Sequence, residues 1–61
     1  MRGLCIGLLH YITEAIDACA SDEEINARFE EVANRNDITS DEYCQIYEQA
    51  ILAYKVKFVW P

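Results

Sequence analysis

The chain has 61 residues, 52% of them hydrophobic, with only two glycines and one proline. This composition excludes a disordered or linker-like chain, and the length leaves room for a single domain, residues 1–61, because so short a chain buries only about 60% of its extended surface. The net charge of −6 disfavours direct binding to nucleic-acid phosphates.

The first predicted helix covers residues 3–19. Small and apolar side chains recur at helical spacing and predict one buried face, made of Cys5, Leu8, Leu9, Ile12, Ala15, Ile16 and Cys19. The polar residues His10, Glu14 and Asp17 collect on the other side and interrupt a superficial likeness to a signal peptide. The apolar run 4–9 is too short to span a membrane, so we expect this segment to belong to the mature fold.

The second predicted helix covers residues 22–35 and begins at a capping box. Ser21 can accept a hydrogen bond from the Glu24 amide, and the Glu24 carboxylate can bond back to the Ser21 amide. The predicted buried stripe is narrow and consists of Ile25, Phe29, Val32 and Ala33. The polar residues 34–37 then predict a turn between two helices. They are rich in side-chain oxygens, as calcium-binding loops are, but they lack the ligand spacing and the central glycine of such a loop.

The third predicted helix covers residues 40–57 and begins at a second capping box, formed by Thr39 and Glu42. Its predicted buried face is rich in aromatic residues and consists of Tyr43, Cys44, Tyr47, Ala50, Ile51 and Tyr54. Lysines near the end complement the negative end of the helix dipole, and an irregular tail follows. The alternation of apolar residues and lysines over 54–58 also suits a strand, for which no convincing partner strand is evident.

These elements predict an all-α protein, a small three-helix bundle whose short connections favour antiparallel neighbours. The three cysteines show no metal-ligand spacing, and Cys5 and Cys19 would lie about 21 Å apart along one helix. We therefore expect free thiols, which suit a reducing cytoplasm, and we expect a cytoplasmic protein. No membrane contact, metal or cofactor is expected.

The sequence offers little for catalysis. It contains one histidine, and so short a chain leaves little room for a pocket of even about 300 Å³. Adjacent carboxylates such as Glu23 and Glu24 point about 100° apart on a helix and cannot share a site. We therefore expect no catalytic residues and no enzymatic activity.

Four apolar residues fall outside the predicted core and are the candidate partner-binding residues: Ile6, Leu52, Val59 and Trp60. Several exposed apolar groups on a small domain indicate an interface, and Trp60 is the best single anchor. Our leading hypothesis is a small acidic protein-binding module, an inhibitor or regulator of another protein, for which a basic surface on the partner would be the natural complement. The alternative is a structural homodimer in which the same residues join identical chains.

The acidic residues support a third hypothesis. All eleven lie between positions 14 and 48 with only two of the basic residues, so this stretch carries a net charge of −9. Glu23, Glu30 and Asp37 are spaced seven apart and would form one strip, as in a nucleic-acid mimic that blocks a basic DNA- or RNA-binding surface. The neighbouring strip formed by Glu24, Arg28, Glu31 and Arg35 can neutralise itself through intrahelical pairs, which is typical of a solvated face.

The run Ile38-Thr39-Ser40-Asp41-Glu42-Tyr43 resembles the start of the second helix in many short helical-hairpin domains of bacterial proteins. Its physical content is a capping box flanked by an apolar pair. In size and acidity the chain is similar to accessory proteins encoded by bacteriophages and mobile elements. This resemblance of class agrees with the hypothesis of a regulator of a host protein.

Overall fold

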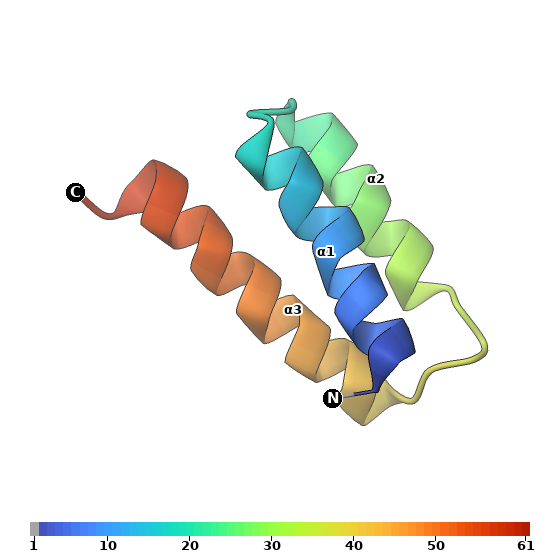
Figure 1. The fold of residues 1–61 in the computed structure, drawn as a ribbon. Helices are drawn as coiled ribbons and strands as arrows, with labels where there is room; N and C mark the ends of the chain where they lie inside the picture. The colour runs from blue at the N-terminus through green and yellow to red at the C-terminus, as the bar shows by residue number, and fades with distance from the viewer. Residues whose placement is uncertain (1) are drawn as a thin grey trace.

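The computed structural model describes residues 2–61 and contains three α-helices followed by a π-helical turn (Figure 1). α1 spans Gly3–Asp17, α2 spans Asp22–Ala33, α3 spans Ser40–Tyr54, and the π-helical turn η1 spans Lys55–Val59. No strand occurs in this part of the chain, so the predicted all-α three-helix bundle is confirmed. Met1, the first residue of the predicted domain, lies outside the described residues.

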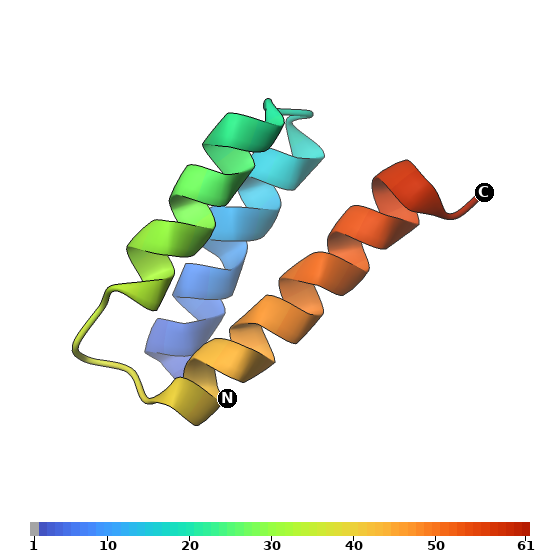
Figure 2. The same cartoon turned by 180° about the vertical axis from the view of Figure 1, so that it is seen from behind.

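The helices α1 and α2 form an antiparallel hairpin, and α3 starts beside the N-terminal end of α1 (Figures 1 and 2). From there α3 runs in the same general direction as α1 but diverges from the hairpin, and η1 continues its line. The molecule is accordingly elongated, with principal dimensions of 34 × 20 × 16 Å. The first half of α3 therefore lies closer to the hairpin than the second half.

The predicted start of α3 is present in full. The Thr39 hydroxyl accepts a hydrogen bond from the Glu42 N–H at 3.1 Å, and the Thr39 N–H donates to the Glu42 carboxylate at 2.8 Å. At the start of α2 only the first bond is made, from the Glu24 N–H to the Ser21 hydroxyl at 3.2 Å. The Glu24 carboxylate instead pairs with Arg28 one turn later, at 3.1 Å.

Two helices end earlier than predicted. α1 ends at Asp17 because Cys19 adopts a φ of 57°, in the left-handed region that usually favours glycine. The Ala20 N–H donates to the Ala15 carbonyl and the Cys19 N–H to the Ile16 carbonyl, both at 3.0 Å, which satisfies the last carbonyls of the helix. α2 ends at Ala33 and not at position 35.

The C-terminal segment is also more regular than predicted. α3 keeps α-helical geometry to Tyr54, and η1 extends the helical conformation to Val59. Only Trp60 and Pro61 follow it, so the irregular tail is shorter than expected.

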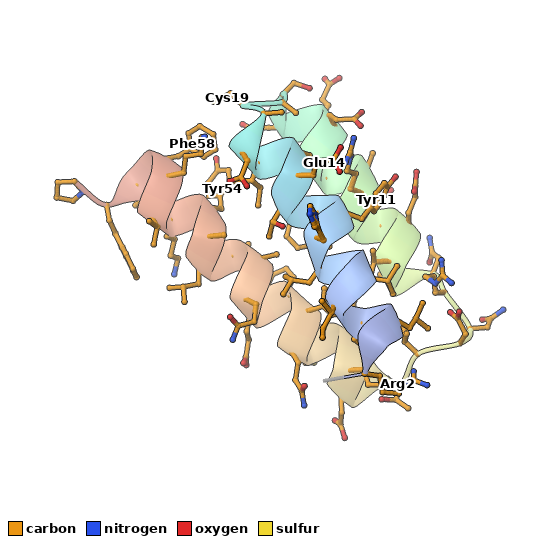
Figure 3. All side chains as sticks on the ribbon, in the orientation of Figure 1. Arg2, Tyr11, Glu14, Cys19, Tyr54 and Phe58 are labelled. Atoms are coloured by element: carbon orange, nitrogen blue, oxygen red, sulfur yellow. The ribbon has the colours of Figure 1, made fainter. Side chains whose placement is uncertain are left out.

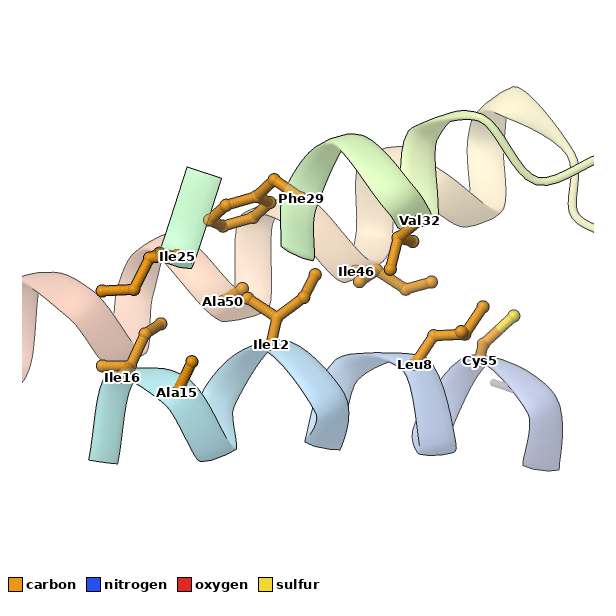
Figure 4. Close-up of a cluster of buried hydrophobic side chains, with 10 residues drawn as sticks. All are labelled: Cys5, Leu8, Ile12, Ala15, Ile16, Ile25, Phe29, Val32, Ile46 and Ala50. Carbon is orange, nitrogen blue, oxygen red and sulfur yellow. The ribbon is translucent and has the colours of Figure 1, made fainter. Parts of the chain in front are cut away.

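The core is one cluster of ten buried side chains to which all three helices contribute (Figure 4). α1 provides half of them, and the full set is Cys5, Leu8, Ile12, Ala15, Ile16, Ile25, Phe29, Val32, Ile46 and Ala50. Four predicted core residues, Cys19, Ala33, Cys44 and Tyr47, are exposed. Ile46 was not predicted to be buried, yet its side chain is fully buried.

The error in α3 has a simple geometric reason. Residues 46 and 47 are neighbours on the helix and point about 100° apart, and both fit the spacing of a buried stripe. Packing against α1 selects the stripe that contains Ile46 and Ala50. Tyr47 is consequently 45% exposed, although its ring still packs against Phe29 at a centroid distance of 5.3 Å.

Candidate protein-binding surface

The exposed apolar side chains are concentrated in the second half of α3 and in η1. Eight large apolar residues of the described chain are exposed, and six of them lie between positions 47 and 60: Tyr47, Leu52, Val56, Phe58, Val59 and Trp60. The other two, Leu4 and Ile6, lie on α1. An apolar concentration of this kind on a small protein is a feature of contact surfaces.

Two shallow depressions run along one side of α3, next to its buried stripe. The first has a volume of about 330 Å³, the second has a volume of about 270 Å³, and they share Tyr47 and Glu48. We call their combined lining the outer face of α3, which consists of Tyr43, Cys44, Tyr47, Glu48, Ile51, Leu52, Lys55 and Trp60. The shared residues make the two depressions one continuous surface along the helix.

The π-helical turn determines where Trp60 lies. The Trp60 N–H donates to the carbonyl of Lys55, five residues earlier, at 2.7 Å, so this turn is wider than an α-helical one. Trp60 then leaves the helix in an extended conformation and lines the second depression together with Leu52. The indole is 50% exposed, which leaves a large apolar surface and one N–H donor available to a partner.

The end of α3 and η1 contact the hairpin through a few side chains. Lys57 Nζ donates to the Asp17 carbonyl at 2.9 Å, where the C-terminal end of α1 favours a cation. The sequence predicts that the lysines complement the dipole of the third helix. Lys57 instead complements the dipole of α1. The Tyr54 hydroxyl donates to Asp22 at 3.4 Å, and its ring packs against Phe58 at a centroid distance of 5.0 Å (Figure 3).

The other end of α3 is joined to α1 by a polar network around Glu42. Its carboxylate accepts hydrogen bonds from Arg2 Nη2 at 2.9 Å, from the Thr39 N–H at 2.8 Å and from the Cys5 thiol at 3.4 Å. The Thr39 N–H is the main cause that lowers the pKa of Glu42 from 4.5 to about 2, and Arg2 adds to it. Arg2 also donates to the Asp37 carbonyl at 3.0 Å.

The four apolar candidates of the sequence are all exposed, with exposed fractions between 46% and 61%. The structure brings Leu52 and Trp60 together in one depression, and Val59 directly precedes Trp60. Ile6 lies on α1 and lines neither depression. Ile6 therefore does not belong to the outer face.

The three acidic candidates occupy two different settings. Glu23 and Glu30 are exposed on α2, as the predicted strip requires. Asp37 lies in the loop after α2 and forms an ion pair with Arg35, with 2.6 Å between Nη2 and Oδ2. The hydrogen bond from Arg35 is the main cause that lowers the pKa of Asp37.

The neighbouring charged strip on α2 is not only solvated, because two of its side chains also contact α1. Arg28 pairs with Glu24 as predicted, but it also donates to the Tyr11 carbonyl at 2.7 Å and lies 4.6 Å from the centroid of the Tyr11 ring. Glu31 accepts a hydrogen bond from the Tyr11 hydroxyl. These contacts with Tyr11, which is labelled in Figure 3, join α2 to α1, so the side chains are part of the fold.

Residues 2–61 contain no cluster of three or more His, Cys, Asp or Glu side chains that could hold a metal ion. Within the same residues, no helix has both the length and the apolar character that a membrane span needs. The three cysteines are free, with Cys5 buried and Cys19 and Cys44 exposed.

No protein-family model matches the chain, and no curated protein or solved structure is significantly similar to it. The proposed function therefore rests on the geometry of the outer face of α3.

Proposed function

We propose that this chain is a protein-binding module that acts by burying the outer face of α3 against another protein. The observation that carries the proposal is the concentration of exposed large apolar side chains between Tyr47 and Trp60. Each Å² of apolar surface that a partner removes from water contributes about 25 cal/mol. These side chains are exposed in the isolated chain, so burying them against a partner would favour association.

Trp60 and Leu52 are the proposed anchors of the contact. They line one depression, and tryptophan is among the residues that most often dominate binding energy in protein interfaces. Glu48 and Lys55 line the same surface and supply charges that orient a partner. A module with these properties regulates or inhibits by occupying a surface of its partner, and no catalytic step is part of the proposal. The free thiols support a cytoplasmic location.

Site-specific photo-crosslinking in the cells that produce the chain tests this proposal. A photoreactive amino acid at Leu52 should give discrete crosslinked proteins, whereas the same group at Glu14, exposed on α1, should give none of them. Trp60→Ala should reduce the Leu52 products, because it removes the proposed neighbouring anchor. The proposal fails if position 52 captures no protein, or if positions 14 and 52 capture the same ones.

An acidic competitor of nucleic acid is the second candidate. It is supported by Glu23 and Glu30, which are exposed and take part in none of the ion pairs within residues 2–61. Asp37 supports it less, because Arg35 already neutralises its charge. This candidate predicts that replacing all three acids with their amides abolishes binding to a basic partner while Trp60→Ala leaves it intact. The opposite pattern would reject it in favour of the outer face of α3.

A further inference from the structure

We infer that the partner best fitted by the outer face of α3 is a second copy of this chain, packed with its α3 antiparallel to the first. This inference rests on the proposed function and names the partner of the same surface. Three properties of the face support it: the positions of its charged residues, its shape and its net charge of zero.

The charges on the outer face are complementary to themselves in an antiparallel pair. Glu48 and Lys55 lie two helical turns apart on this face, with Ile51 and Leu52 between them. If a two-fold axis passes midway between Glu48 and Lys55, each Glu48 lies level with Lys55 of the other copy. The symmetry then creates two equivalent ion pairs. A parallel pair would instead place Glu48 beside Glu48, which is unfavourable.

The shape of the face fits the same arrangement. The Ile51 and Leu52 side chains of both copies would meet at the axis. Trp60 lines the same depression as Ile51 and Leu52, so its indole also lies close to the axis and adds to the apolar contact. Tyr43, Cys44 and Tyr47 line the depression of about 330 Å³ further along the face, and the two-fold symmetry directs η1 of the other copy towards it. The apolar linings of both depressions would therefore be buried in the same contact.

The charge balance of the face also favours a second copy over a basic partner. The chain carries −6, but Glu48 and Lys55 are the charged residues of the outer face, so the face itself is neutral. The exposed acids Glu23 and Glu30 lie on α2. The mutual repulsion of two acidic chains is therefore not focused on the proposed contact. Burying this face would also add to the small core that so short a domain can form.

Sedimentation equilibrium of the full chain between about 5 and 500 μM tests the inference, and we expect a reversible dimer. Glu48→Lys and Lys55→Glu should each raise the dissociation constant about tenfold, because two attractive pairs become repulsive. The double variant E48K/K55E should return within about threefold of wild type, because the pairs are reversed and not lost. Glu30→Lys, with the same charge change on α2, is the control and should stay within about threefold of wild type.

Several outcomes would overturn the inference. These are a wild-type chain that is monomeric over the whole range, single variants that behave like Glu30→Lys, or a double variant that is no better than the singles. A monomeric chain whose position 52 still crosslinks to a different protein would overturn the self-pairing and leave the protein-binding module intact. If the chain is monomeric and position 52 captures nothing, both are wrong.

Discussion

The two halves of α3 differ in what they contact. The first half holds the fold together, since Glu42 joins it to α1 and Ile46 is fully buried. In the second half Ala50 is fully buried, but the rest of this half and η1 contact the hairpin through a few side chains and leave Leu52 and Val56 exposed. The start of α3 stabilises this chain, and its end carries the apolar surface that we propose as the contact with another chain.

The largest expected effect tests the first half of α3. Ile46→Ala removes a fully buried side chain from between α1 and α2, and it should lower the free energy of unfolding by about 2–5 kcal/mol. Leu52→Ala, in the second half, should change it by less than about 0.5 kcal/mol. Urea unfolding followed by circular dichroism measures both. Equal losses at the two positions would mean that the halves do not differ as described.

The next effect concerns the start of α3. Thr39→Ala removes the hydroxyl that caps the helix and should cost about 1 kcal/mol. Ser21→Ala is the matched comparison at the start of α2, and it should cost less because the reciprocal bond from Glu24 is not made there. Urea midpoints of the two variants give the comparison. A larger loss for Ser21→Ala would contradict the assignment of the complete box to α3.

Acid should loosen the same end of α3. The pKa of Glu42 is lowered from 4.5 to about 2 in the folded chain, so its carboxylate stabilises the fold above pH 4.5. This contribution is lost progressively as the pH falls from 4.5 towards 2. Glu42→Gln should therefore flatten the decline of the urea midpoint over this range, and Arg2→Gln should flatten it partly. Identical pH profiles for Glu42→Gln and wild type would refute the role given to Glu42.

The smallest effect on stability is expected at the far end of the second half. Trp60→Ala should leave the free energy of unfolding of the monomer within about 0.5 kcal/mol of wild type, because the side chain is half exposed and follows the last helical turn. The measurement is urea unfolding at a concentration below the onset of association. A loss comparable to that of Ile46→Ala would assign Trp60 to the core and not to a contact surface.

The starts of α2 and α3 could be predicted from the sequence because capping is local: Ser21 and Thr39 contact amides within the next three residues. The end of α1 could not, since the residue in the left-handed conformation is a cysteine and not a glycine or asparagine. The sequence also does not determine whether Ile46 or Tyr47 is buried. Both fit the helical spacing, and only packing against α1 distinguishes them.

The candidate surface was predictable in part. The exposure of Leu52 and Trp60 follows from their positions outside the buried stripe, and the structure agrees. Their grouping with Tyr47, and the separation of Ile6 from them, depend on the direction in which α3 leaves the hairpin and on the π-helical turn. Neither feature has a local signal in the sequence.

The fluorescence of Trp60 tests the contact surface most directly, because it is the only tryptophan of the chain and lies on the outer face of α3. As the protein concentration rises from about 1 to 500 μM, we expect the emission to shift to shorter wavelengths and to become protected from iodide quenching, and Glu48→Lys should delay both changes. Emission and quenching that stay constant over this range would contradict burial of the outer face against a second copy.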